Sequence, residues 1–236
     1  MKIISIANTT GGSGKSTTAM AVAVAAAEYG RNVLLIDLDE RANLTFQFAI
    51  ENPRFTMLEV ATGAISADLA IIRTNERIDF LPAAPRITAL DTAQISVENL
   101  KQKFINYDLV VIDTSSALNQ RLTLAGQISD AVLYVSTDSL LAVRGVVLAS
   151  DFFKQADTLG VLPIMTTDKT EAISILSRDF KVLNPAIPFD KSVLIAQIEN
   201  KSVLNHAKAG LASDAYRDVT YFLLEELFGS KTDTTL

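Results

Sequence analysis

Short apolar runs recur along the chain, and they have the length and composition of β-strands. Most of them are apolar at consecutive positions, not at alternate ones, which is typical of strands covered on both faces and hence of a parallel sheet. The predicted strands are Ile3–Ala7, Val33–Ile36, Ile78–Leu81, Leu109–Ile112, Ala131–Val135 and Val161–Met165.

Helix-length segments separate these strands. Two of them end at a glycine, which is a frequent way to stop a helix before the next strand. The predicted helices are Ser16–Tyr29, Leu140–Leu159 (before Gly160), Thr170–Leu183 and Gly210–Phe228. Strands that alternate with helices predict a doubly wound α/β fold, with a mostly parallel sheet flanked by helices and right-handed crossovers.

The chain shows no linker, repeat or low-complexity segment. We therefore expect residues 1–228 to form a single domain and residues 229–236 to form a polar C-terminal tail. With 49% hydrophobic and 20% charged residues, the sequence excludes a disordered protein.

Composition also excludes several kinds of site. The absence of cysteine rules out disulfides, thiolate zinc sites, Cys-ligated iron–sulfur clusters and cysteine nucleophiles, and it fits a reducing cytoplasm. The single histidine, His206, is expected to be a surface or helix residue. A net charge of −6 excludes a wholly basic nucleic-acid coat but leaves room for a local basic patch.

No apolar segment predicts a targeting peptide or a membrane span. The stretch from Ala19 to Ala27 is about half as long as a bilayer-spanning helix. The C-terminal helix is amphipathic, but its polar face is acidic, and anionic lipid would repel it. We expect a cytoplasmic protein that makes no membrane contact.

The first loop carries the strongest chemical signal. It follows a predicted strand and opens a predicted helix, which is the context of a phosphate-binding loop. Backbone amides of such a loop surround phosphate groups, Lys15 would reach the β- and γ-phosphates, and the Ser16 hydroxyl would ligate Mg²⁺. Thr9 stands where the usual pattern has glycine. The expected nucleotide-binding residues are Gly11, Gly12, Ser13, Gly14, Lys15, Ser16 and Thr17.

Carboxylates follow two of the predicted strands. Asp37 and Asp39 end one strand, and because they alternate, both would point the same way from an extended chain. Asp113 ends another strand in the Walker B arrangement, whose carboxylate holds Mg²⁺. Ligands collect at the carboxyl ends of parallel strands, so these residues predict an active site beside the glycine loop.

In combination, the glycine loop, residues 37–45 and residues 107–113 resemble the ParA/MinD-type deviant Walker ATPases, which have the P-loop NTPase fold. Further similarity in residues 78–84, in residues 129–135 and from Ile187 onward extends the resemblance over nearly the whole chain.

The resemblance implies an ATPase that binds ATP and Mg²⁺ and forms a homodimer with ATP sandwiched at the interface. It also implies nonspecific DNA binding by the dimer and slow hydrolysis that a cargo-bound partner protein stimulates. Carried over by position, Lys15 and Asp39 are catalytic, and Asp39 orients the attacking water. Ser16, Asp37 and Asp113 belong to the Mg²⁺ site.

One position departs from this family. The signature lysine that crosses the dimer is replaced by Thr10, which carries no charge. Three explanations remain open: another cation acts across the dimer, with Lys154 and Arg144 as candidates; the dimer forms without one; or the protein is a degenerate ATPase or a non-catalytic nucleotide-binding scaffold. The carboxysome-distributing McdA branch resembles this loop in lacking the lysine, which favours positioning of a protein cargo on the nucleoid over plasmid partition.

The DNA hypothesis requires a basic surface. In the region that matches the DNA-contacting surface of the family, acidic neighbours weaken the positive field, and scattered basic residues usually only solvate a surface. The candidates are Arg178, Lys181, Lys191 and Lys201.

A metabolic P-loop enzyme, such as a dethiobiotin-synthetase-like ligase, is the alternative function, because fold and loop alone do not decide function. We interpret Arg121 as an ordinary surface arginine, with a place near the phosphate face of the dimer as the alternative. The pairs Phe46/Phe48 and Phe152/Phe153 are interpreted as core or interface residues.

Overall fold

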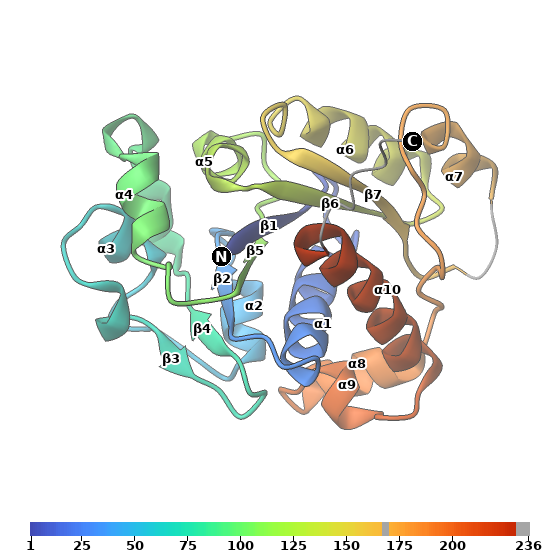
Figure 1. The fold of residues 1–236 in the computed structure, drawn as a ribbon, viewed down its shortest axis with the longest axis horizontal. Coiled ribbons are helices and arrows are strands. Elements are labelled where there is room, and N and C mark those ends of the chain that lie inside the picture. Colours follow the sequence, from blue (N-terminus) through green and yellow to red (C-terminus); the bar gives the residue numbers. More distant parts are fainter. Residues whose placement is uncertain (167–169, 230–236) are drawn as a thin grey trace.

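A computed structural model describes residues 1–166 and 170–229, and its centre is a single seven-stranded sheet (Figure 1). The strand order is β3-β4-β2-β5-β1-β6-β7, and every neighbouring pair is parallel except β3 with β4. The strands are β1 (Lys2–Ala7), β2 (Val33–Asp37), β3 (Ile72–Arg73), β4 (Asp79–Leu81), β5 (Leu109–Asp113), β6 (Ala131–Ser136) and β7 (Asp157–Pro163). The predicted fold class is confirmed.

Helices cover both faces of this sheet (Figure 1). The α-helices are α1 (Lys15–Glu28), α2 (Asn43–Gln47), α3 (Met57–Ala61), α4 (Val97–Gln102), α5 (Gln120–Ile128), α6 (Leu140–Ser150), α7 (Glu171–Leu176), α8 (Lys191–Ile198), α9 (Val203–His206) and α10 (Leu211–Phe228). Short 3₁₀ helices span Ala67–Leu69, Pro85–Ala89 and Thr92–Gln94.

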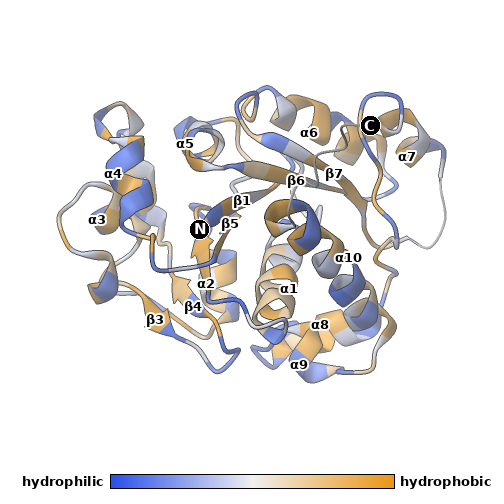
Figure 2. Ribbon diagram, in the orientation of Figure 1, coloured by the Kyte–Doolittle hydropathy of each residue, from blue (hydrophilic) through white to orange (hydrophobic). Residues whose placement is uncertain are grey.

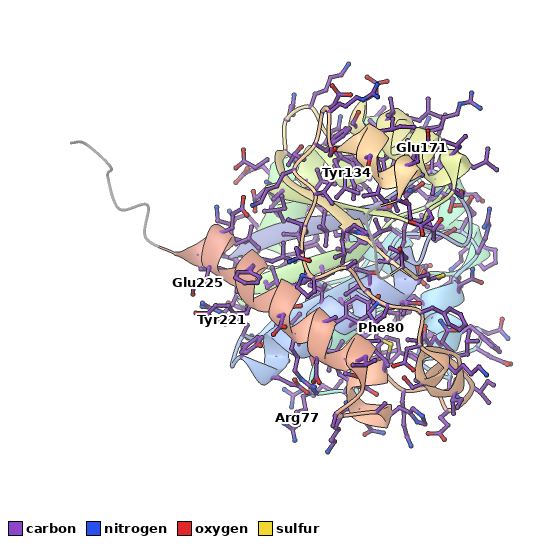
Figure 3. All side chains as sticks on the ribbon, turned by 90° about the vertical axis from the view of Figure 1, so that its right-hand side faces the viewer. Arg77, Phe80, Tyr134, Glu171, Tyr221 and Glu225 are labelled. Carbon is purple, nitrogen blue, oxygen red and sulfur yellow. The ribbon has the colours of Figure 1, made fainter. Side chains whose placement is uncertain are left out.

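Successive side chains of the central strands pack against opposite helical layers. Ile4 and Ile6 of β1 belong to the core with α1 and α10, whereas Ile3 belongs to the core with α5 and α6. Both layers need apolar partners, so the strands are apolar at nearly every position, as Figure 2 shows for the middle of the sheet. The outward side of α10 carries polar and aromatic residues, with Tyr221 and Glu225 at its edge in Figure 3.

The helix predicted for Leu140–Leu159 is too long. Helix α6 ends at Ser150, and β7 begins at Asp157. Gly160 therefore does not stop a helix but lies inside a strand, with φ +135. A Cβ atom there would lie 2.6 Å from the carbonyl oxygen of Lys181, so the close approach of two backbone segments requires glycine.

The prediction of one helix over Thr170–Leu183 is also wrong in its second half. Thr170 caps α7, but this helix ends at Leu176. Val182 instead forms a bridge with Val161 of β7, and the Leu183 amide donates to the Val161 carbonyl at 2.8 Å. This segment extends the sheet edge, so pairing with a distant strand overrides its local helical pattern.

Helix α10 agrees with its predicted range within one residue. The predicted tail lies outside the described residues except for Gly229. Within residues 1–166 and 170–229, no helix is both long enough and apolar enough to cross a bilayer.

Replacing Gly160 with alanine should lower the free energy of unfolding by about 2–3 kcal/mol, because the new methyl group meets backbone at an unfavourable φ. Chemical denaturation measures this change. Gly30→Ala is the matched control: Gly30 also has positive φ, but nothing lies within 4 Å of the new atom, so a loss of about 1 kcal/mol is expected. Equal losses for the two variants would contradict the close-approach interpretation.

Candidate functional site

The glycine loop lies between β1 and α1 and forms one wall of an open cavity of about 680 Å³. Gly12 and Gly14 have positive φ, which turns the backbone tightly before α1 begins at Lys15. The N-terminus of α1 therefore points at the cavity, as in sites that bind phosphate. The lining residues include Gly12, Ser13, Gly14, Lys15, Ser16, Thr17, Asp39, Arg41, Phe46, Ser116 and Gln197.

Side chains at the start of the loop attach it to α6. The buried Asn8 amide donates to the carbonyls of Val135 (2.6 Å) and Ala142 (3.0 Å). The Thr10 hydroxyl donates to the Leu141 carbonyl at 2.8 Å. Thr10 therefore makes a hydrogen bond inside the subunit, at the position where the resemblance led us to expect a lysine.

Lys15 is the buried cation of the site, with a relative exposure of 6%. Its Nζ donates to the Ser116 hydroxyl at 2.7 Å and to the Thr10 carbonyl at 3.2 Å. Burial lowers the pKa of Lys15, and the negative charges of Asp113 and Asp39 oppose this effect.

Asp37 ends β2 and is fully buried. One carboxylate oxygen accepts the Asp39 amide at 3.0 Å, and the other accepts the Thr45 amide and hydroxyl at 3.0 and 2.8 Å. Burial raises the pKa of Asp37 to about 6, although these hydrogen bonds act in the opposite direction. The side chain thus fixes the path of the chain that follows β2.

Asp113 pairs in register with Asp37 across β2 and β5. Among the described residues, neither of its buried oxygens has a hydrogen-bond partner within normal geometric limits. Burial, followed by the nearby charge of Asp37, raises the pKa of Asp113 well above its ordinary value, and the Ser16 hydroxyl partly opposes the shift. A buried carboxylate without partners is costly, so this position suits a cation or a cation-bound water.

Asp39 faces the cavity from the turn after β2 and is 6% exposed. Its Oδ1 accepts the Arg41 amide at 3.0 Å. Burial raises the pKa of Asp39, while that hydrogen bond and the charges of Arg41 and Lys15 lower it. The structure therefore brings Asp37, Asp39 and Asp113 to the same end of the sheet as the glycine loop.

Arg121 is not a surface arginine, contrary to the sequence-based interpretation. It is 8% exposed, and its Nη2 lies 3.0 Å from Oε2 of Glu40, the residue that follows Asp39. The Ser115 hydroxyl donates to the same oxygen at 2.8 Å. The pair therefore joins the turn after β2 to the loop after β5 and to α5.

The two candidates for a cation that crosses a dimer lie outside the residues that line the cavity. Arg144 is exposed on α6. Lys154 does not lie on that helix, because α6 ends at Ser150, and it pairs with Asp151 at 3.2 Å on the surface. The structure leaves both side chains accessible to a second subunit.

All four DNA candidates are exposed, but they do not form one free patch. Lys181 pairs with Glu226 at 2.7 Å, and Lys201 pairs with Glu199 at 3.1 Å. Arg178 follows α7 and Lys191 begins α8, which lie at opposite ends of the same side of the molecule in Figure 1.

The structure also places the single histidine and the phenylalanines named in the sequence analysis. His206 ends α9, and its Nδ1 lies 3.0 Å from a Glu199 oxygen. Phe48 stacks on Phe80, and Phe153 is buried, whereas Phe46 is 64% exposed at the cavity.

Sequence reasoning missed three residues at the cavity. Ser116 contacts Lys15, the Gln197 amide donates to the Thr17 hydroxyl at 3.0 Å, and Arg41 lines the opening. Arg41 and Ser116 lie close in sequence to Asp39 and Asp113, and that proximity could have identified them. Gln197 comes from α8 and carries no local signal.

Arg121→Met should destabilise the protein by about 1–3 kcal/mol, because it leaves the partly buried Glu40 carboxylate without its cation. The double variant Glu40→Met/Arg121→Met should recover to within about 1 kcal/mol of the original protein, since no charge is then left alone. Urea denaturation measures both.

Arg217→Met is the matched control. It breaks a more exposed Arg–Glu pair, with Glu28, for which a loss of about 1 kcal/mol or less is expected. An Arg121 variant no more destabilised than this control would contradict the buried-pair interpretation.

Comparison with known proteins identifies relatives along the whole chain. The family model described as "AAA domain" matches residues 1–159. An uncharacterised ATP-binding protein of Methanocaldococcus jannaschii is 28% identical, covering 91% of this chain and 84% of its own length. The sporulation initiation inhibitor protein Soj of Bacillus subtilis is 25% identical, covering 92% and 96% respectively. A ParA family protein of Chlamydia pneumoniae is 26% identical, covering 95% of this chain and 98% of its own length.

Solved structures show the same fold. Cobyrinic acid a,c-diamide synthase of Mycobacterium smegmatis, with an ATP analogue and magnesium, has a TM-score of 0.82 at 23% identity, covering 97% of this chain and 96% of that one. MinD of Pyrococcus horikoshii with Mg-ADP has a TM-score of 0.81 at 22% identity, covering 96% and 97%. A variant of Cyanothece McdA in complex with ATP has a TM-score of 0.80 at 19% identity, covering 94% of this chain and 96% of that one. The chain belongs to the AAA domain family and, as its motifs indicate, to the ParA/MinD-type P-loop ATPases.

Proposed function

We propose that this protein is an ATPase switch that uses ATP to dimerise and to bind DNA nonspecifically, and so positions a cargo on the nucleoid. One observation carries the ATPase part of the proposal. The glycine loop with Lys15 and the carboxylates Asp39 and Asp113 converge at one end of the sheet, beside one open cavity.

The residues at this end of the sheet fit Mg²⁺ as well as ATP. Mg²⁺ is usually held by one or two carboxylates, by phosphate oxygens and by water. Asp113 offers buried oxygens that have no partner among the described residues, and the Ser16 hydroxyl lies beside it. When bound, the ion would neutralise charge on the phosphates. Asp37 already accepts hydrogen bonds from the Asp39 and Thr45 amides, so it would support the ion site indirectly, by holding the chain that follows β2.

The protein side chains then have separate roles. The loop amides and Lys15 hold the phosphates, with Thr17 beside them at the start of α1. Asp39 orients a water molecule for attack on the terminal phosphate. Phosphoryl transfer depends mainly on positioning and charge stabilisation, so this small set is sufficient for slow hydrolysis that a partner can accelerate.

The cellular part of the proposal is supported by the relatives. Soj and the ParA family protein match along nearly the whole chain, and the McdA structure shares the fold. We propose that residues 1–228 act as one ATPase domain in the cytoplasm, that the ATP-bound homodimer associates with the nucleoid, and that a cargo-bound partner stimulates hydrolysis. A protein cargo, such as a carboxysome, is favoured over plasmid DNA.

We propose that DNA binds at a groove near Lys201, although Glu76 and Glu199 also line it. It lies between the β3–β4 hairpin and the α8–α9 region, and its basic side chains could contact successive phosphates. Figure 3 places Arg77 at the lower edge of the molecule, pointing outward. The basic residues of the groove are Arg73, Arg77, Lys201 and Lys208.

The ligase-type alternative has less support. The diamide synthase shares the fold, but the MinD and McdA structures share it equally well, so the fold does not distinguish the two classes. The relatives in sequence include a ParA family protein and Soj.

Single substitutions in the cavity test the ATPase proposal. Lys15→Ala should abolish ATP binding, because the buried cation that faces the phosphates is lost. Asp39→Ala should keep ATP binding but lower turnover at least about 100-fold, since removal of a group that positions reactants typically has that effect. Calorimetric titration and phosphate release measure these two properties. Unchanged turnover would remove Asp39 from its assigned role.

Charge reversal tests the DNA surface. Arg77→Glu and Lys201→Glu should each weaken binding to duplexes of any sequence, and each lost phosphate contact should reduce the log–log salt slope by about 0.9. Lys103→Glu, after α4 on another part of the surface, is the control and should bind like the original protein. If the ATP-bound protein does not bind DNA at low salt, the proposal of DNA binding fails and the ligase alternative gains support.

A further inference from the structure

The phosphate end of the cavity has a charge requirement that the glycine loop meets only in part. ATP carries several negative charges, and the loop offers Lys15 as its cation. Thr10 is neutral, and its hydroxyl already donates to the Leu141 carbonyl of α6. Among the described residues that line the cavity, the second cation is Arg41.

A tight turn places Arg41 beside the glycine loop. The Arg41 amide donates to Asp39 Oδ1, the Ala42 amide donates to the Asp39 carbonyl, and both distances are 3.0 Å. Ala42 has φ +50, which reverses the chain before α2 begins at Asn43. The Arg41 Nη1 lies 3.6 Å from the position that a Cβ atom on Gly11 would take.

The turn is fixed from its other side as well. Glu40 lies between Asp39 and Arg41, and its carboxylate is held by the Arg121 guanidinium and the Ser115 hydroxyl. The Arg41 backbone is therefore braced by two independent sets of hydrogen bonds. Only the side chain has to move in order to meet a ligand.

The Arg41 guanidinium is available for a ligand. The side chain is exposed and makes no ion pair within residues 1–166 and 170–229. Its positive charge already acts on the site, because it lowers the pKa of Lys15 and that of Asp39. Guanidinium presents several donors in a planar fork that matches phosphate oxygens.

We propose that Arg41 binds the terminal phosphate of ATP bound to its own subunit and supplies the positive charge that Thr10 does not. This inference rests on the proposed nucleotide function. A cation that contacts only the terminal phosphate favours ATP over ADP, because ADP lacks that phosphate. It also acts in a monomer, whereas Arg144 or Lys154 could act only across a dimer.

Equilibrium binding tests this assignment without relying on turnover. A non-hydrolysable ATP analogue and ADP, each with Mg²⁺, are titrated into protein at a concentration where sedimentation shows monomers. Arg41→Gln should weaken binding of the analogue about tenfold, as expected for loss of one charge-assisted hydrogen bond at a partly exposed site. Its affinity for ADP should stay unchanged.

Matched variants sharpen the result. Arg41→Lys keeps the charge and should retain part of the preference for the analogue. Arg144→Gln and Lys154→Gln should bind both nucleotides as the original monomer does. All variants should unfold at the same denaturant concentration as the original protein, since these side chains lie at the surface.

Two results would overturn the inference. One is an Arg41→Gln monomer that keeps the full preference for the analogue over ADP. The other is a preference that depends on Arg144 or Lys154 and arises only when the protein dimerises. Failure of the original protein to bind either nucleotide would instead contradict the proposed function, so the two failures are distinguishable.

Discussion

The site is organised around two carboxylates that the sheet forces together away from water. Asp37 and Asp113 are opposite each other at the ends of neighbouring parallel strands, and both are almost completely buried. Desolvation makes the ionised form of each unfavourable, and the charge of Asp37 raises the pKa of Asp113 further. The surrounding groups can be understood as responses to this concentration of negative charge. Thr45 donates twice to Asp37, and Lys15 is held close to Asp113 although burial disfavours its own charge.

Much of this arrangement could be predicted because it follows from local sequence. A strand covered on both faces must be apolar throughout, so β1, β2, β5 and β6 are visible as continuous runs. The residues directly after such strands must lie at one edge of a parallel sheet, which places the glycine loop, Asp37 and Asp113 together. The errors lie where partners distant in sequence decide the outcome. Gly160 resembles a helix stop, but the Lys181 backbone makes it a strand position, and Val182 pairs with β7 instead of continuing a helix.

The same limit explains the mistake about Arg121. An arginine in an amphipathic helix is normally exposed, and nothing near it in the sequence indicates otherwise. Its burial depends on Glu40, which β2 delivers from a distant part of the chain. Thr10 illustrates the opposite case. Its lack of charge is evident from the sequence, but only the structure shows that its hydroxyl is occupied by the Leu141 carbonyl.

The contacts of Lys15 in this structure have a thermodynamic consequence. Its ammonium group has three donors, and they already contact the Ser116 hydroxyl, the Thr10 carbonyl and, at 3.5 Å, the Ser13 hydroxyl, so an arriving phosphate competes with these bonds. The enthalpy gained from that contact is correspondingly smaller. In return, the Ser116 hydroxyl is released, and Ser116 adjoins Ser115, which holds Glu40. A phosphate at the glycine loop would therefore change the contacts of a segment, Ser115–Ser116, that also holds the turn after β2.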